Sequence, residues 1–240
     1  MMRGSPLTGM LTVRDDAAPP NPPPAALARV AAIWQAEKAR RGDALFDGRL
    51  FSIRTLTPGL ITGWLAPYSW YVAQRRDKTL AAALDIRPLG VTGIMICDDG
   101  IVFGRRGGEV ETDAGLWELA PSGGVDGEFR AADGAIDLGA QLLNELVEET
   151  GLPATLAKAT PRPVALAEDG DSGITDVGLL LRIACGAETV RAAFAPLAGQ
   201  EYAELAVVPR DALGAFVAAR AGHFGRVSRC LIETLSLTTP

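Results

Sequence analysis

The pattern of hydrophobic and polar positions divides the chain into three stretches. Residues 1–24 show no apolar repeat, and they end in the proline-rich run 19–24, which favours an extended polyproline II conformation. We therefore expect a disordered tail over residues 1–24. Residues 25–41 carry apolar side chains at helical spacing and end in basic residues before Gly42, which predicts a helix.

Short apolar runs broken by glycine and proline follow this helix. They predict strands or an irregular β lobe over residues 45–53, 60–64 and 70–72. Together with the helix, these runs predict an N-terminal extension lobe over residues 25–87.

From residue 88 onwards, apolar runs separated by turn residues predict a second domain, residues 88–240. Two of these runs flank Asp98-Asp99-Gly100 and read as a hairpin. A glutamate-rich helix lies in the middle of the domain, further strands follow it, and helices are expected over 210–219 and 226–235. This order predicts an α/β (α+β) sandwich with a mixed sheet, because the regular alternation of a doubly wound fold is missing.

The glutamate-rich segment Asn144–Leu152 carries the clearest chemical signal. At 100° per residue, Glu145 and Glu149 lie about 40° apart and Glu148 about 60° to the other side, so the three carboxylates share one helical face. Gly151 is suited to end the helix. Such a face is either solvated surface or a place where a hard divalent cation relieves the repulsion between the carboxylates.

Composition narrows the classes of function. The chain is 48% hydrophobic and 22% charged, as in ordinary soluble domains, and its net charge is −6 without a basic block. These values argue against a nucleic-acid polymer as partner. His223 is the only histidine, which leaves little material for a zinc site or a Ser-His-Asp triad.

The cysteines and the apolar runs bear on the compartment. Three widely spaced cysteines without a C-x-x-C pair indicate buried free thiols. No apolar run is long enough for a membrane span, and the first residues lack a signal-peptide pattern. We expect a cytoplasmic protein without membrane association.

The glutamate-rich helix and the segment upstream of it resemble a known family. Trp117–Gly124 supplies a strand that runs into a glycine pair, and Asn144–Leu152 follows the form R-E-U-x-E-E-x-G-U, where U is a bulky aliphatic residue. A glycine pair, a loop and this helix are typical of Nudix hydrolases. The resemblance covers roughly residues 88–215.

Two positions depart from the family pattern. The usual glutamate before the helix falls on Ile136, and the usual arginine falls on Asn144. In the family these ionic positions orient the metal-binding carboxylates. Asp137, next to Ile136, is a candidate to replace the missing acid, and the loop between the glycine pair and the helix is longer than usual.

The resemblance implies metal-assisted hydrolysis of a nucleoside diphosphate linked to another moiety. It implies Mg²⁺ or Mn²⁺ as cofactor, with Glu145, Glu148 and Glu149 as metal ligands. The general base is left open between the box glutamates Glu145 and Glu149 and the later Glu201. Further acidic candidates lie on loops, where a solvated side chain is the simpler interpretation: Glu168, Asp169, Asp171 and Glu204.

Three further side chains are candidates for substrate binding. Arg105 and Arg106 stand at the end of a predicted hairpin, where they either bind phosphate oxygens or are a solvated strand end. Trp117 either stacks on a base or packs in the core.

A weaker resemblance concerns the substrate. Residues 78–80, residues 87–93 and the following hairpin are similar to the Nudix branch that hydrolyses UDP-glucose and UDP-galactose, so a small nucleotide sugar is the expected substrate, with ADP-ribose fitting almost as well. The alternative is a catalytically weak Nudix-fold sensor or interaction module for nucleotide sugars. Family habit also implies a homodimer.

Overall fold

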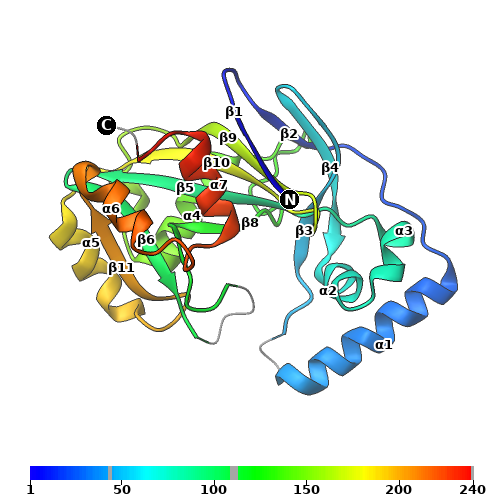
Figure 1. Ribbon diagram of the computed structural model, residues 1–240. Helices are drawn as coiled ribbons and strands as arrows, with labels where there is room; N and C mark the ends of the chain where they lie inside the picture. Colours follow the sequence, from blue (N-terminus) through cyan, green and yellow to red (C-terminus); the bar gives the residue numbers. More distant parts are fainter. Residues whose placement is uncertain (43–44, 109–112, 239–240) are drawn as a thin grey trace.

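Two β-sheets organise the chain, as the computed structural model of residues 1–42, 45–108 and 113–238 shows (Figure 1). The larger sheet has the order β1-β9-β10-β5-β6-β11, with β7 paired to β6 and β8 paired to β5. Its β10 and β5 are parallel, and its other neighbours are antiparallel, which makes the sheet mixed. Its strands are β1 (Met2–Pro6), β5 (Leu89–Cys97), β6 (Gly100–Arg106), β7 (Trp117–Leu119), β8 (Ser122–Gly124), β9 (Arg162–Asp169), β10 (Thr175–Arg182) and β11 (Tyr202–Val208).

Helices cover both faces of the larger sheet. Leu142 and Leu146 of α4 are fully buried in a core cluster that includes β5, β10 and α5. On the other face, Leu231 of α7 packs in a second cluster with Phe103 of β6. The helices of this part are α4 (Leu138–Thr150), α5 (Ala187–Phe194), α6 (Leu213–Ala218) and α7 (Arg226–Thr234), with short 3₁₀ turns over Ala154–Leu156, Ala195–Leu197 and Arg210–Ala212. The expected α/β sandwich with a mixed sheet is confirmed.

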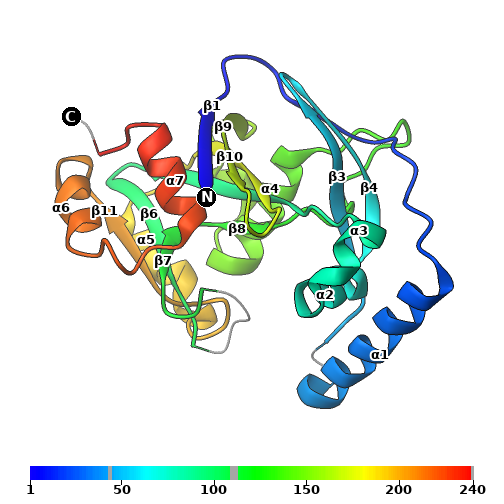
Figure 2. The ribbon, with the colours of Figure 1, turned by 45° about the vertical axis from the view of Figure 1, so that its right-hand side comes forward.

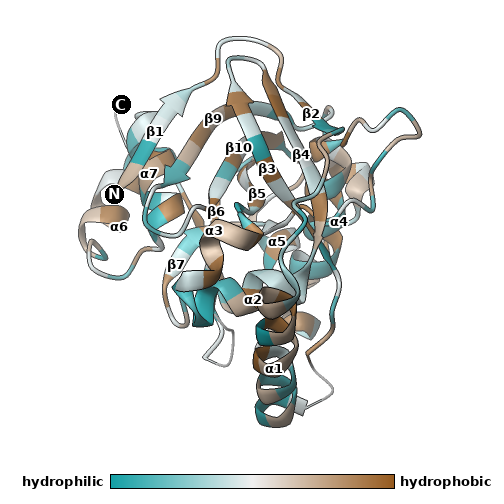
Figure 3. Cartoon of the chain, turned by 90° about the vertical axis from the view of Figure 1, so that its right-hand side faces the viewer, coloured by the Kyte–Doolittle hydropathy of each residue, from teal (hydrophilic) through white to brown (hydrophobic). Residues whose placement is uncertain are grey.

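The N-terminal part forms a lobe with its own sheet and core. Its sheet has the order β2-β4-β3, and three helices lie beside it. Figures 2 and 3 show α1 extending away from the larger sheet, with α2 and α3 lying between α1 and that sheet. The elements are β2 (Thr12–Asp15), α1 (Pro24–Arg41), β3 (Arg49–Thr57), β4 (Leu60–Pro67), α2 (Tyr68–Arg76), a 3₁₀ turn (Lys78–Leu80) and α3 (Ala81–Leu84).

The prediction of a disordered tail over residues 1–24 is wrong for two segments that form strands. Met2–Pro6 pairs antiparallel with β9 of the larger sheet, and Thr12–Asp15 pairs parallel with β4 of the smaller one. Residues 7–11 and 16–23 have no strand or helix, and the second of these stretches holds most of the proline-rich run, as expected from the backbone preference of proline.

The strand predicted over residues 70–72 is also wrong, because this segment belongs to α2. Aromatic and β-branched residues favour strands, but Ser69, Val72 and Ala73 are the buried residues of α2, and their spacing is that of one helical face. The backbone N–H of Ser69 donates to Asp47 Oδ1 at 2.8 Å, which satisfies a donor at the start of the helix. Among the described residues, no helix is long and apolar enough to cross a membrane.

Candidate active site

Helix α4 holds the glutamates in a defined orientation. Asp137 Oδ1 accepts a hydrogen bond from the backbone N–H of Ala140 at 3.0 Å and so caps the first turn, and Gly151 ends the helix with a φ of 71°. Because Leu142 and Leu146 are buried, the rotation of the helix about its axis is fixed. Glu145 and Glu149 are partly buried as a result, and Glu148 is exposed.

Glu149 is the most enclosed of the three glutamates. Its Oε2 accepts hydrogen bonds from the backbone N–H of Ser122 at 2.9 Å and from the hydroxyl of the fully buried Tyr202 at 3.0 Å. Burial raises the pKa of Glu149 well above its usual range, and the charges of Glu145 and Glu201 add to the effect. The side chain therefore joins α4 to β8 and β11.

Glu145 lies directly against the glycine pair. A Cβ at Gly123 would overlap its carboxylate, so this position accepts no larger residue while Glu145 keeps its place. Gln141, one turn earlier, donates from Nε2 to Glu145 Oε1 at 2.9 Å. The pKa of Glu145 is raised to about 7, chiefly by burial; the hydrogen bond from Gln141 lowers it, and the charges of Glu148 and other nearby acids raise it.

Two more glutamates and one arginine complete the group. Arg106 Nη1 lies 2.9 Å from Glu118 Oε1, and Arg106 Nη2 lies 2.8 Å from Glu201 Oε1. The hydroxyl of Ser122 donates to Glu118 Oε1 at 3.1 Å. Glu118 is 8% exposed, and burial raises its pKa despite the arginine. We call Glu118, Glu145, Glu149 and Glu201 the acidic cluster.

The acidic cluster fits a hard divalent cation by its donor chemistry. Its carboxylate oxygens are the ligands that Mg²⁺ prefers. Burial is the main cause of the raised pKa of Glu149, and the repulsion from Glu145 and Glu201 that adds to it is what a cation would relieve. Within the described parts of the chain, however, no group of three or more His, Cys, Asp or Glu side chains is arranged to hold a metal ion. Binding would therefore need side-chain rotation, for which the exposed Glu148 and the 36% exposed side chain of Glu201 have room.

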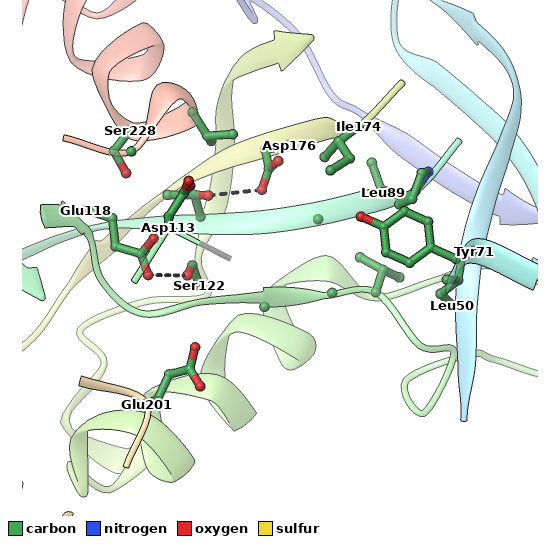
Figure 4. A pocket seen from close by; sticks show the side chains of 18 of the residues that line it. Leu50, Tyr71, Leu89, Asp113, Glu118, Ser122, Ile174, Asp176, Glu201 and Ser228 are labelled. Atoms are coloured by element: carbon green, nitrogen blue, oxygen red, sulfur yellow. Dashed lines mark hydrogen bonds between the residues drawn. The ribbon is translucent and has the colours of Figure 1, made fainter. Parts of the chain in front are cut away.

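A cleft of about 460 Å³ lies beside the acidic cluster, between the larger sheet and the N-terminal lobe (Figure 4). Arg106, Glu118 and Glu201 line one part of it, together with the strand Ser122–Gly124. Residues of the N-terminal lobe, of β5, of β10 and of the turn just before β10 line the other part: Arg49, Leu50, Tyr68, Tyr71, Leu89, Ile174 and Asp176. Glu145 and Glu149 do not line the cleft, and Glu145 lies against Gly123 of the lining strand.

The structure brings some predicted site residues together and leaves others apart. The three box glutamates, Glu201 and Arg106 belong to the same region. Arg105 points elsewhere and pairs with the exposed Glu204 at 3.1 Å, and neither lines the cleft. These two residues are therefore a solvated pair at a strand end.

Trp117 lies in the core, so its predicted contact with substrate is not supported. It is 6% exposed, and its ring lies 5.3 Å from that of Phe216, with the guanidinium carbon of Arg220 5.4 Å above it. The loop acids Asp169 and Asp171 are bound to Arg226, which leaves them outside the cleft.

The side chains that support the acidic cluster also differ from those that the sequence predicted. Ile136 is buried in the core, and Asp137 caps α4. Hydrogen bonds to Glu145 and Glu149 come instead from the side chains of Gln141 and Tyr202 and from the backbone of Ser122. Gln141 could have been found from its spacing of four residues before Glu145, whereas Tyr202 is joined to Glu149 only by the fold.

The sequence did not indicate Glu118, Tyr71 or Asp176 as site residues. Glu118 lies in the predicted strand that precedes the glycine pair, where a lone charge between apolar residues was the available signal. Tyr71 was hidden by the wrong strand prediction. Asp176 faces the cleft only because β10 pairs with β5, a contact between distant parts of the chain.

No family model and no curated protein matches the sequence. Among solved structures, the chain is similar to a bifunctional NMN adenylyltransferase/ADP ribose pyrophosphatase from Francisella tularensis, with a TM-score of 0.44 and 16% identity over 70% of this chain and 46% of that chain. A structure of such a bifunctional protein from this organism complexed with AMP and Mn ion gives a TM-score of 0.45 and 15% identity, with the same coverage. The chain thus spans less than half the length of either.

Proposed function

We propose that the protein is a Nudix-type hydrolase that cleaves the pyrophosphate bond of a nucleoside diphosphate linked to another moiety. The observation that carries this proposal is the acidic cluster: carboxylates from α4, β7 and the start of β11 meet at the glycine pair beside the cleft. Arg106 pairs with two of these four carboxylates. Partly buried acids in such excess over their cationic partner are costly to a fold, so they indicate chemistry.

The roles of the residues follow from their positions. Glu145, Glu148 and Glu149 would hold Mg²⁺ or Mn²⁺, which supplies neutralisation of the pyrophosphate charge and activation of water. Arg106, fixed between Glu118 and Glu201, lines the cleft and is the side chain best placed to bind phosphate oxygens. Glu201 is the candidate base, because it lines the cleft and its charge acts on both Glu145 and Glu149.

A nucleotide sugar is the substrate class we favour. The cleft has a charged part at the acidic cluster and a part lined by Leu50, Tyr71 and Leu89, which suits a ligand with a pyrophosphate and a ring. UDP-sugars and ADP-ribose both have this form. Incubation with a panel of UDP-sugars, ADP-ribose and dinucleotide polyphosphates in the presence of Mg²⁺, with the phosphate products identified, tests the choice.

One observation favours a second function, a nucleotide-sugar sensor with little or no turnover. The described acidic side chains are not arranged around a common ion position, and the positions of the usual ionic support are occupied by Ile136 and Asn144. Binding of the panel without turnover would support this second function and contradict the first.

The Glu149→Gln variant tests the assigned ligands. We expect it to lose hydrolysis at least about 100-fold, because an amide cannot replace a carboxylate in holding the cation. The melting temperature should not fall, since the amide oxygen can still accept the hydrogen bonds from Ser122 and Tyr202 and the neutral side chain avoids the cost of a buried charge. The measurement is kcat/KM together with Tm.

The exposed Glu188 of α5 provides the matched control. Glu188→Gln removes the same charge at a position that does not line the cleft and should leave kcat/KM unchanged. Full activity of Glu149→Gln would refute the assignment of this residue. Paramagnetic broadening by Mn²⁺ supplies a second readout: it should be specific to residues around α4 in the wild type and weaker in the variant.

A further inference from the structure

Asp176 is a carboxyl group in the cleft for which the proposed hydrolysis has no use. It lies on β10, where its Cα is the register partner of Gly90 on β5. In the described part of the chain its carboxyl group makes one hydrogen bond, from the hydroxyl of Thr92 to Oδ1 at 3.1 Å, and no ion pair. Its other oxygen has acceptor capacity that the protein leaves unused.

The sheet is shaped to make room for this carboxyl group. A Cβ at Gly90 would stand 2.5 Å from Asp176 Oδ1, so any other residue at this position would displace the carboxyl. Asp176 is only partly exposed, and burial raises its pKa to about 7. Keeping a carboxyl group in this position costs free energy because it is partly withdrawn from water. We take this as an indication that a ligand donates hydrogen bonds to it.

The surroundings of Asp176 suit the flat, apolar side of a ring. Figure 4 shows Tyr71 of α2 with its phenol oxygen directed into the cleft, which Leu89 and Ile174 also line. Leu50 of β3 lies beside it. Sugar rings have this combination of a C–H surface and projecting hydroxyl groups, and carboxylates are good acceptors for such hydroxyls.

We infer that Asp176, with the wall formed by Leu50 and Tyr71, is a subsite for a hydroxylated sugar ring, and that Asp176 is a specificity-determining residue which accepts hydrogen bonds from its hydroxyl groups. The inference rests on the proposed function for its choice of substrate class and deepens it. It also gives the N-terminal lobe a role, because Leu50 and Tyr71 come from that lobe. The ring is either the ribose of the nucleotide or the second sugar of the substrate, since both present hydroxyl groups.

Equilibrium binding without turnover tests the subsite. Isothermal titration in EDTA, and with Mg²⁺ on Glu149→Gln protein, gives Kd for UDP-glucose and for analogues that each lack one hydroxyl, on the ribose or on the hexose. We expect Asp176→Asn to weaken binding of UDP-glucose about 10- to 100-fold, the value of a hydrogen bond to a charged group. One analogue should bind wild type and variant with equal Kd, and its missing hydroxyl identifies which ring occupies the subsite.

Two further variants keep the test independent of folding. Gly90→Ala should reproduce the loss, because its methyl group displaces the Asp176 carboxyl while Asp176 itself is unchanged. The exposed Asp211 is the matched control, and Asp211→Asn should bind every ligand as the wild type does. The melting temperature of each variant shows whether a loss of binding is local.

The outcomes distinguish a failure of the proposed subsite from a failure of the proposed hydrolase function. If Asp176→Asn weakens binding of every analogue by the same factor, or if no ligand binds the wild type at millimolar concentration, the inference is overturned. Hydrolysis of UDP-glucose with an unchanged Kd in Asp176→Asn would also overturn it while leaving the proposed function intact. Binding with the expected hydroxyl dependence but without hydrolysis would support the subsite and contradict the hydrolase.

Discussion

At the scale of single residues, the acidic side chains around the cleft are held where burial opposes their charge. Glu145 and Asp176 each have a pKa raised to about 7, with burial as the largest cause, and the pKa values of Glu118 and Glu149 are raised in the same way. A group whose folded-state pKa is raised binds a proton in the folded state that the unfolded chain releases. The free energy of unfolding should therefore fall as the pH rises from about 4 to 7, which is a cost the fold bears for its site.

Asp176 allows this cost to be measured at one position. At pH 5 its carboxyl is mostly protonated in the folded protein and ionised in the unfolded chain, and at pH 8 it is ionised in both. Asp176→Asn should therefore gain stability relative to the wild type as the pH rises, by at least about 1.4 kcal/mol between pH 5 and pH 8, the free energy of one pKa unit. Urea unfolding at the two pH values measures this difference.

The same measurement on Asp211→Asn provides the comparison for an exposed carboxyl. Its effect on the free energy of unfolding should stay within about 0.5 kcal/mol at both pH values. If Asp176→Asn gained no stability between pH 5 and pH 8, its carboxyl would not be buried as the structure indicates, and the acceptor in the cleft would be an ordinary solvated acid.

At the scale of elements, α4 shows what can be inferred from a local pattern. Its glutamate face and its end at Gly151 were predicted, because spacing and capping residues lie within the segment itself. The partners of those glutamates were not, because Ser122 and Tyr202 reach Glu149 through pairings between distant strands. The misassigned α2 has the same cause: its buried face is determined by what it packs against.

The start of α4 distinguishes a capping role for Asp137 from a role in support of the metal ligands. Removing an N-cap acceptor typically costs about 0.5–2 kcal/mol. We expect Asp137→Ala to lower the free energy of unfolding by this amount and to leave kcat/KM within about threefold of the wild type, a change well under about 1 kcal/mol. Urea unfolding and kinetics on the same preparation measure both.

Asp137→Ser is the matched variant, because serine is an equally good N-cap residue but carries no charge. Its stability should return close to that of the wild type. A large loss of kcat/KM in both variants would instead assign to Asp137 the acidic support role that its neighbour Ile136 lacks.

At the scale of the whole molecule, the first residues of the chain hold the two sheets together. β1 pairs with β9 at one edge of the larger sheet, and β2, a few residues later, pairs with β4 of the smaller sheet. The segment 1–15 therefore crosses between the two parts that form the cleft. This arrangement could not be predicted, because Met2–Pro6 has neither alternation nor hydrophobicity, and its partner lies more than a hundred residues further along the chain.

Removal of residues 1–6 tests whether this crossing stabilises the fold. The deletion takes away the β1 ladder, exposes the backbone of β9 and removes the contact between Gly4 and Thr234 of α7. We expect it to lower the free energy of unfolding by roughly 2–4 kcal/mol, the usual size of a large structural loss, and to promote association through the new edge. Urea unfolding and size-exclusion chromatography at several concentrations measure the two effects.

Arg3→Ala separates the contribution that backbone pairing of β1 makes to the free energy of unfolding from the contribution of its charged side chain. Arg3 Nη2 lies 2.8 Å from Glu168 Oε1 in a pair whose arginine is 74% exposed, and exposed pairs contribute about 0–1 kcal/mol. The point variant should therefore unfold nearly as the wild type does, because its backbone still pairs with β9. Equal losses in both would show that β1 contributes only its ion pair. A deletion that left the free energy of unfolding unchanged would mean that the two sheets keep their arrangement through the core between β3, β4 and β5 alone.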